Sequence, residues 1–527
     1  MKCYLITGID ELSCFSDACP RGEISDVARE EVMRLVVGGR LVEDDSYDDY
    51  DGFSHHEVKR TVTHRLLAKD CIVSGDRVVG YYDRRVFRID TLEADLEVPK
   101  EWAKVKLFYS PAEPQTLVYG EEAERNECVV RVDVPDGTEC VCGLDAYPNL
   151  FELHLPASLK RVEGHSAFDR AFCLDKVVFG GGAEEWCGIG FADKRSNPCC
   201  YGAALVFGDV PVTEVEVTCE RVAPYAFYGV PIQSVRFSDA VGEIGAYAFS
   251  KCPSLERVDF SACQGATIGE GAFSECGGLP RVSLPKGMTA IAKDAFSHTA
   301  SLRSVTIPEG VTEIGENAFA RSGLIAIVLP VSLRVIGKSA FSSCDGLSLL
   351  ELPVGIKQVC DEAFYACKGL TRVTAKGGVL TKIGERAFAY CNGLQTFDFP
   401  EGLLEIGGEC FSYAAFTGEI ALPASLQTLG GASFAHCEGL TAFRVPASVR
   451  RIFSDLDDCH GLVDLYLPHD LEYFSLVRTY RAKPLTVHYD GTAAEWAVKE
   501  VYIRVKGDSP VTVVCKDGSL SYERQAR

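Results

Sequence analysis

A phenylalanine recurs at a nearly constant interval through the middle of this 527-residue chain. From residue 249 to residue 434 the steps are 22 to 24 residues, and most of these phenylalanines follow an alanine. The series is Phe249, Phe273, Phe296, Phe319, Phe341, Phe364, Phe388, Phe411 and Phe434. A fixed period of this size indicates a solenoid, in which each unit stacks only on its neighbours. We therefore expect these side chains to form the repeat core, with Phe319 buried between Phe296 and Phe341.

Other residue types keep the same interval. An aliphatic residue, usually followed by glycine, precedes each phenylalanine by four or five positions, as in Ile314-Gly315. A leucine follows about six positions later, and then a short alternating run such as 305–307 usually ends in proline. The alternation predicts a short strand with two residues facing inward and one facing outward. Proline ends the strand because it lacks the N–H that a continuing ladder needs.

This pattern resembles the BspA-like leucine-rich repeat family, whose unit reads roughly Leu-x-x-Ile-x-Leu-Pro, a spacer, and Ile-Gly-x-x-Ala-Phe-x-x-Cys-x-x-Leu. Residues 305–324 match this unit nearly letter for letter, with Ser322 in the place of the cysteine. The resemblance covers roughly 131–175 and 211–470. It implies an α/β-type, β-rich leucine-rich repeat solenoid of ~23-residue repeats, with a role in adhesion or protein–protein interaction.

Residues 1–130 do not repeat, and we interpret them as a small N-terminal α+β domain of unknown role. The apolar spacing over 23–37, followed by Gly38-Gly39, predicts a helix. The acidic run over 43–51 is interpreted as a solvated loop, with a cation site as the alternative. Short apolar runs predict strands at 60–67, 71–73, 77–82, 85–89 and 104–108.

Two segments with a tryptophan interrupt or follow the repeats. Residues 179–186, which end in Trp186, align without gaps to 489–496, which end in Trp496. Because the open end of a solenoid exposes backbone donors and an apolar face, we interpret 476–527 as a C-terminal β cap. The copy at 178–210 is then an internal cap-like insert between a short repeat block at 131–177 and the main solenoid at 211–475. Stacking of the two tryptophans on a glycan is the alternative.

The chain has 23 cysteines, and many occupy one repeat position. Six of them stand three residues after a core phenylalanine, at Cys252, Cys276, Cys344, Cys367, Cys391 and Cys437. Other repeats have Thr299, Ser322 or Ala414 at that position. A position that accepts all four residue types requires a small side chain rather than a disulfide partner. We therefore expect reduced, structural cysteines.

The net charge of −22, from 53 basic and 75 acidic residues, argues against a nucleic-acid partner or an anionic membrane surface. It favours a soluble monomer. No apolar run is long enough to span a membrane, and no signal peptide is recognisable, which favours a cytoplasmic location. The family resemblance implies instead a secreted or cell-surface protein.

The sequence carries none of the common catalytic or cofactor-binding motifs, so we expect no catalytic residue, metal or cofactor. Cys140 and Cys142 are too sparse for a zinc site. A metal bound by His55, His56 and His64 is an alternative that the alternation of a strand disfavours.

The function that fits best is a non-catalytic scaffold that presents a concave β-sheet face to a protein partner. The outward positions of the strands vary while the core positions repeat, as a binding solenoid requires. The predicted binding residues are Arg257, Asp259, Arg281, Ser283, Thr306, Glu351, Arg372, Thr374, Asp398, Arg444 and Tyr466. The alternative is a sensor or enzyme whose activity lies in residues 1–130, with the repeats as a ligand-reading arm.

Overall fold

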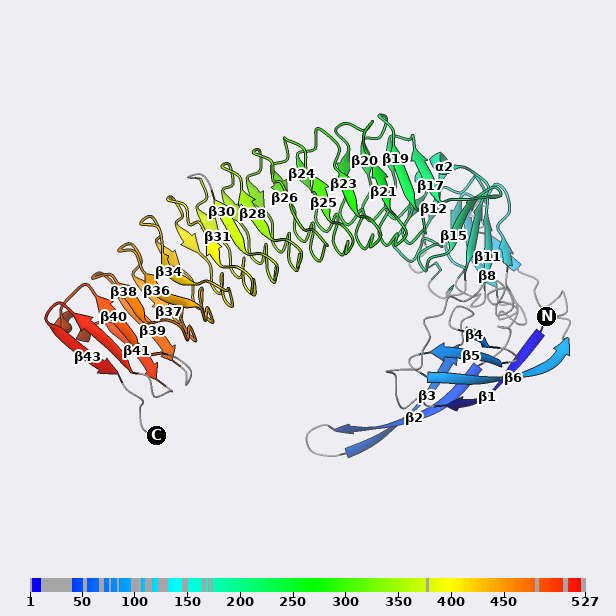
Figure 1. Cartoon of the computed structure of the whole chain (residues 1–527). Coiled ribbons are helices and arrows are strands. Elements are labelled where there is room, and N and C mark those ends of the chain that lie inside the picture. The colour runs from blue at the N-terminus through cyan, green and yellow to red at the C-terminus, as the bar shows by residue number, and fades with distance from the viewer. Residues whose placement is uncertain are drawn as a thin grey trace. The chain divides into compact units, whose positions relative to one another are not determined.

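The repeating segments form the coils of a solenoid in the computed structural model (Figure 1). The structure describes residues 131–522 except 145–149, 164–166, 169–170, 172–173, 376–378, 479–482 and 506–509, together with the backbone of strands β1–β8 within 1–130. These residues divide into two compact units, Met1–Val212 and Thr213–Arg527. The predicted solenoid of ~23-residue repeats is confirmed, because parallel strands recur at that interval.

Antiparallel strands form the beginning of the first unit. One sheet has the order β1 (Lys2–Asp10), β6 (Arg85–Asp95), β5 (Arg77–Tyr82), β4 (Cys71–Ser74), and a separate hairpin joins β2 (Arg40–Tyr50) to β3 (His55–Arg65). The predicted loop over 43–51 is wrong, because residues 43–50 lie in β2 and pair with β3. Pairing with a partner strand outweighs the low strand propensity of aspartate, which single-residue reasoning misses. The helix predicted over 23–37 lies outside the described residues.

The first unit then changes to parallel pairing. β7 (Lys106–Tyr109) and β8 (Thr116–Glu121) form a hairpin, and β8 pairs in parallel with β10 (Cys140–Val141). The same sheet continues with β12 (Arg161–Val162) and β14 (Gly190–Phe191). A second parallel row contains β9 (Arg131–Asp133), β11 (Glu152–Leu155), β13 (Lys176–Phe179) and β15 (Ala204–Phe207), and it ends in the antiparallel β16 (Val210–Pro211).

The second unit stacks its coils in sequence order from β17 to β43 (Figure 1). Its first row of strands is parallel except for the last member, and we call the solvent-exposed side of this row the strand face. The row comprises β17 (Glu214–Val217), β19 (Ser234–Phe237), β21 (Arg257–Asp259), β23 (Arg281–Ser283), β25 (Ser304–Thr306), β28 (Leu349–Leu352), β30 (Arg372–Ala375), β32 (Thr396–Phe397), β34 (Gly418–Ala421), β36 (Leu440–Arg444), β38 (Asp464–Leu467), β40 (Leu485–Tyr489), β42 (Val511–Cys515) and the antiparallel β43 (Gly518–Tyr522).

A second row contains the aliphatic residue that precedes each glycine. Its strands are β18 (Arg221–Val222), β20 (Glu243–Ile244), β22 (Thr267–Ile268), β24 (Ala290–Ile291), β26 (Glu313–Ile314), β27 (Val335–Ile336), β29 (Gln358–Val359), β31 (Lys382–Ile383), β33 (Glu405–Ile406), β35 (Thr428–Leu429), β37 (Arg451–Phe453), β39 (Tyr473–Arg478) and β41 (Glu500–Val505). The glycine after the strand is required where coils touch. A Cβ at Gly337 would lie 2.7 Å from the carbonyl oxygen of Ile314 in the preceding coil.

The turns that carry the phenylalanines form a third ladder. In the coil of Phe319, the N–H groups of Asn317, Phe319 and Arg321 donate to carbonyl groups of the next coil at 2.7 to 3.0 Å. Asn317 and Arg321 have φ angles of 52° and 56°, and this left-handed backbone recurs two residues before and after the phenylalanine in neighbouring coils. The core phenylalanines are fully buried and stack with ring centroids 5.1 to 5.6 Å apart.

The cysteine after each phenylalanine has a second role that sequence reasoning missed. The Cys344 thiol donates to the carbonyl oxygen of Phe319 in the preceding coil at 3.2 Å, and Cys367 donates in the same way to Phe341 at 3.1 Å. Seventeen cysteine side chains lie in the described part of the chain, and none of them forms a disulfide bond. Thr299 at the same position in another coil also donates, but to the carbonyl oxygen of Phe296 in its own coil at 2.7 Å.

Iodoacetamide is expected to alkylate Cys219 much faster than Cys391 in the folded protein. Cys391 is fully buried, and burial raises the pKa of its thiol to about 12. Cys219 is only partly buried. The thiolate is the nucleophile, so a thiol that is both shielded and protonated, as in Cys391, reacts slowly. Mass spectrometry after timed alkylation measures the two rates, with the denatured protein as the control in which they converge. Equal rates in the folded protein would contradict the buried cysteine column.

Two five-residue helices hold the aligned tryptophans. α2 (Ala183–Cys187) contains Trp186, and α3 (Ala493–Ala497) contains Trp496. Trp186 packs edge-on against Phe179 and Trp496 packs against Tyr489, with ring centroids 5.2 and 5.1 Å apart. Both indoles are buried, so the alternative that they stack on a glycan is wrong. That 178–210 and 476–527 act as caps remains our proposal, which is consistent with antiparallel β16 and β43 following each parallel row.

Candidate functional site

The predicted binding residues lie on the strand face, where alternation along each strand directs them away from the core. In β21, β23 and β25 the central valine is buried, while the residues on either side are exposed or partly exposed. All eleven predicted binding residues are exposed or partly exposed. They fall into three groups along the solenoid, so the structure does not join them into one site.

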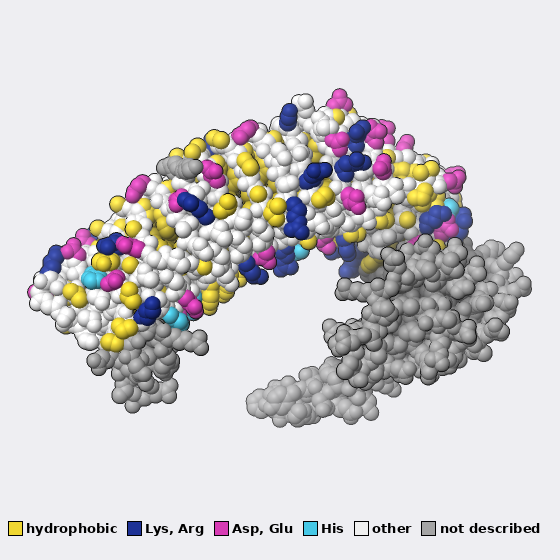
Figure 2. All heavy atoms as spheres, viewed as in Figure 1, with side chains coloured by type: hydrophobic (Ala, Val, Ile, Leu, Met, Phe, Trp, Pro, Cys, Tyr) yellow, Lys and Arg dark blue, Asp and Glu magenta, His cyan; other side chains and the backbone are white. Residues whose placement is uncertain are grey.

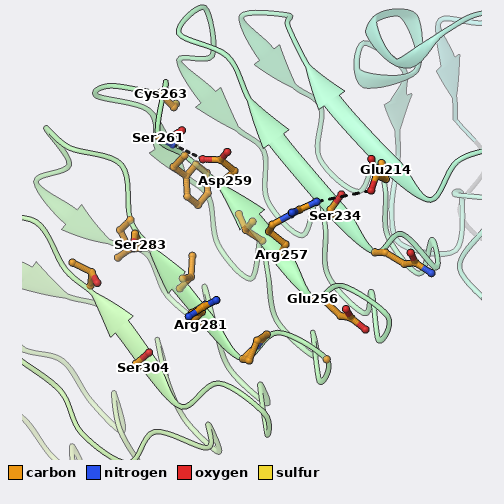
Figure 3. Close-up of a pocket in the computed structure, with 18 of the residues that line it drawn as sticks. Glu214, Ser234, Glu256, Arg257, Asp259, Ser261, Cys263, Arg281, Ser283 and Ser304 are labelled. Carbon is orange, nitrogen blue, oxygen red and sulfur yellow. Dashed lines mark hydrogen bonds and ion pairs between the residues drawn. The ribbon is translucent and has the colours of Figure 1, made fainter.

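Five of the predicted residues line one groove on the strand face, between β21 and β23 (Figure 3). The groove has a volume of about 910 Å³. Its lining includes Arg257, Asp259, Arg281, Ser283 and Thr306. In Figure 3, Arg257 extends toward Glu214, and the two side chains form an ion pair of 3.9 Å. Hydrogen bonds from Ser261, followed by the charge of Arg236, hold the pKa of Asp259 below its usual value.

The groove exists because the strand ladder is interrupted there. β21 pairs with β19 and β23 pairs with β25, but no ladder joins β21 to β23. Pro280 occupies the position of Glu256 in the preceding coil and of Arg303 in the next, whose N–H groups each donate to a neighbouring coil at 2.8 Å. Proline has no N–H to donate. The connection from Phe260 to Ile268 is also one residue longer than that from Ile307 to Ile314. This extra residue accompanies a second interruption, between β22 and β24.

The second group of predicted binding residues lies on or next to β28, β30 and β32. Glu351 lies on β28, Arg372 and Thr374 lie on β30, and Asp398 follows β32. Arg372 and Asp398 form an ion pair of 3.8 Å. Both side chains are exposed, so this pair contributes at most about 1 kcal/mol to stability.

The third group forms a stack that is already satisfied within the chain. The guanidinium carbon of Arg444 lies 3.7 Å from the ring centre of Tyr466, and Arg444 also pairs with Glu419. On its other side Tyr466 stacks on His488, at 4.5 Å between ring centroids, and His488 contacts Asp464 at 2.8 Å. Arg444 and Tyr466 therefore have less capacity for a new partner than their exposure suggests.

An apolar patch that sequence reasoning missed lies on the strand face and in the turns next to it. It comprises five aliphatic side chains from two adjacent coils, each 50 to 82% exposed: Ile325, Val328, Val331, Leu349 and Val354. Figure 2 shows hydrophobic side chains beside basic ones on the visible surface of the second unit. The signal was present in the sequence, because Val328 interrupts a column in which the preceding coils have Ser283 and Thr306.

One group of potential metal ligands occurs among the described residues. The ligand atoms of Cys140, Cys142 and Glu163 lie within 4.8 Å of one another. Arg161 Nε is 2.7 Å from the Glu163 carboxylate, which therefore already has a cationic partner. The sequence analysis considered Cys140 and Cys142 as metal ligands but did not include Glu163. Elsewhere in the described part of the chain, no helix has the length and apolar character of a membrane span.

Comparisons with known proteins identify the repeat. The family model described as BspA type Leucine rich repeat region matches in six copies over 207–325, 312–441 and 381–476, which together span 270 of the 527 residues. No curated protein matches the chain.

Three solved bacterial structures are similar to it in arrangement. A leucine-rich repeat protein of Bacteroides ovatus is 21% identical, with 72% of this chain and 96% of that chain covered and a TM-score of 0.48. A leucine-rich repeat protein of Eubacterium ventriosum is 17% identical, with 69% of this chain and 94% of that chain covered and a TM-score of 0.44. A leucine rich cell surface protein of Faecalibacterium prausnitzii is 17% identical, with 82% of this chain and 97% of that chain covered and a TM-score of 0.37. With more than half of its residues matched by the family model, the chain belongs to the BspA type leucine-rich repeat family.

Proposed function

We propose that this chain is a non-catalytic scaffold that binds a protein partner through the strand face. The observation that carries the proposal is the apolar patch of Ile325, Val328, Val331, Leu349 and Val354. Large aliphatic side chains grouped on an otherwise polar surface are typical of interaction sites. Their burial against a partner yields about 25 cal/mol for each Å² of apolar surface removed from water.

The solenoid core makes such a surface possible. Phenylalanine, cysteine and glycine positions maintain the coil geometry, so the exposed strand positions can vary without a cost in packing. Neighbouring coils demonstrate this tolerance, because Thr306 occupies the column of Val328 and Ser304 occupies the column of Leu349. Polar residues at Val328 and Leu349 are therefore compatible with the fold.

The double substitution Val328→Thr and Leu349→Ser tests this proposal. We expect it to weaken partner capture at least tenfold, because each lost aliphatic contact is worth about 1 kcal/mol. The full chain is used as bait for extracts of the organism that makes it, and captured proteins are quantified by mass spectrometry. The matched control is Val498→Ser, an exposed valine beside α3 and away from the patch.

A charge-reversal variant extends the test to the rest of the strand face. Arg257→Glu, Arg281→Glu and Arg372→Glu in one chain are compared with Lys251→Glu, Arg321→Glu and Lys338→Glu in the phenylalanine turns. Glu275 already occupies the turn column of Lys251 and Arg321 with the same left-handed backbone, so the control substitutions fit the fold. Capture that is unchanged by both the patch variant and the strand-face reversal would refute binding through this face.

A further inference from the structure

Three basic side chains lie in the two coils that precede the apolar patch, and none has an anionic partner among the described residues. Arg281, Lys286 and Arg303 are exposed, and within the described residues none of their side chains forms an ion pair or hydrogen bond. Other strand-face arginines differ: Arg236, Arg257, Arg372 and Arg444 each have a carboxylate within 4.0 Å. In a chain with 75 acidic residues, unpaired neighbouring cations leave a local site for negative charge.

Backbone pairing places Arg303 one coil from the patch, and Arg281 and Lys286 one coil further away. The backbone N–H of Arg303 donates to the carbonyl oxygen of Pro280 at 2.8 Å. The backbone N–H of Ile325 donates to the carbonyl oxygen of Arg303 at 3.2 Å. Arg303 therefore lies one coil from Ile325 and one coil from the segment that begins β23. The same order holds nearer the strand centre, where Ser283 pairs with Thr306 and Thr306 bridges to Val328. The groove, the cations and the apolar patch thus occupy consecutive coils, from β23 and β25 to the following two coils.

Glu309 and Glu351, which lie in the coils of Arg303 and Leu349, are engaged within the chain, whereas the exposed Glu256 also lines the groove. The Glu309 carboxylate accepts the N–H of Val331 at 3.4 Å, and Glu351 also has an interaction within the chain. On the far side of the patch, Arg372 lies opposite Leu349 in the ladder, so basic residues border the patch on both sides. The strand-face serines Ser283 and Ser304 add hydroxyl donors at the groove.

We propose that the partner presents an extended segment in which aliphatic side chains are flanked by carboxylates. This deepens the proposed function and rests on it. The aliphatic side chains would cover the patch, and the carboxylates would contact Arg281 and Arg303, with Lys286 at the groove. Parallel strands are spaced about 4.8 Å apart, so the path from β23 to β28 covers roughly 14 Å. An extended segment of about five residues has that length.

Selection from a random peptide library on the immobilised full chain tests the chemistry of this segment. Peptides of about ten residues exceed the length of the path. We expect the enriched peptides to combine at least two large aliphatic residues with a net negative charge. Their affinity, measured by fluorescence polarisation, should fall about tenfold or more in the double variant Arg281→Gln and Arg303→Gln. The control variant Lys251→Gln and Arg321→Gln removes the same charge from the phenylalanine turns and should bind normally. The difference between the two variants should shrink as salt is raised, because screening weakens exposed charges.

The outcomes separate this inference from the proposed function. Peptides that bind through Val328 and Leu349 but are neutral or basic would overturn the acidic partner and leave the apolar interface intact. The same holds if Arg281→Gln with Arg303→Gln leaves affinity unchanged. Preferential binding of a single-stranded DNA probe at these arginines would also overturn a peptide partner. If no enriched peptide distinguishes the wild-type chain from the Val328→Thr and Leu349→Ser variant, both proposals fail.

Discussion

Replacing Phe319 with alanine is expected to lower the free energy of unfolding by about 3–5 kcal/mol. Phe319 is fully buried, and its ring lies 5.6 Å from that of Phe296 and 5.3 Å from that of Phe341. Truncation would leave a cavity between two coils that touch only their neighbours. Because the loss falls on these two interfaces, we expect the single unfolding transition to separate into two. Calorimetry and chemical denaturation of the wild-type and variant chains measure both effects.

Tyr390→Ala provides a matched aromatic control. Tyr390 stacks on Tyr413 at 4.7 Å, but it remains partly exposed in a turn. Ala366 occupies the equivalent position one coil earlier with a similar left-handed backbone, so alanine fits there. We expect this variant to lose clearly less stability than Phe319→Ala. An unfolding transition of Phe319→Ala that matches the wild type would show that the phenylalanine stack does not support the solenoid.

Raising the pH from about 4 to about 8 is expected to destabilise the coil around Asp455 by roughly 2–4 kcal/mol. Asp455 occupies the position before Leu456 that is alanine in most coils, and it is fully buried. Burial raises the pKa of Asp455 to about 7, despite hydrogen bonds donated by Ser433 and by the N–H of Phe453. The unfolded chain has an aspartate pKa of about 3.9.

The sign follows from the difference between these two pKa values. Between them, the folded state binds more protons than the unfolded state, so stability falls as the pH rises and levels off above the folded pKa. Asp457 acts in the same direction, because burial also raises its pKa. Hydrogen-exchange protection factors for peptides covering 450–478, corrected for intrinsic exchange, measure the local stability at each pH.

Asp455→Asn separates this carboxyl group from its neighbours. The variant removes the buried charge and keeps a side-chain oxygen as an acceptor, so we expect greater protection than wild type at about pH 8 and a flatter pH dependence. Some dependence should remain from Asp457, because burial also raises the pKa of its carboxyl group. An unchanged pH dependence in Asp455→Asn would show that Asp455 does not titrate in this range.

The repeat period by itself determined which side chains form the core. Each coil contacts only its neighbours, so a residue that recurs every 22 to 24 positions meets its own equivalent in the next coil. The outward strand positions could be located in the same way, because the alternation in 305–307 acts within one coil. The path of residues 43–50 was missed, because β2 depends on pairing with β3 rather than on its own composition.

The candidate binding surface required the tertiary structure, because it depends on how neighbouring coils align. The missing N–H of Pro280 coincides with an interrupted ladder and a groove, which only the pairing of neighbouring coils reveals. The outward column of the predicted strand sites could be read from the sequence, but not which of its arginines had a carboxylate within reach. Arg257 forms an ion pair with Glu214 two coils away, whereas Arg281 has no such partner among the described residues. Ion pairs and exposed apolar patches are properties of side chains from different coils, so only the stacked solenoid decided where they lie.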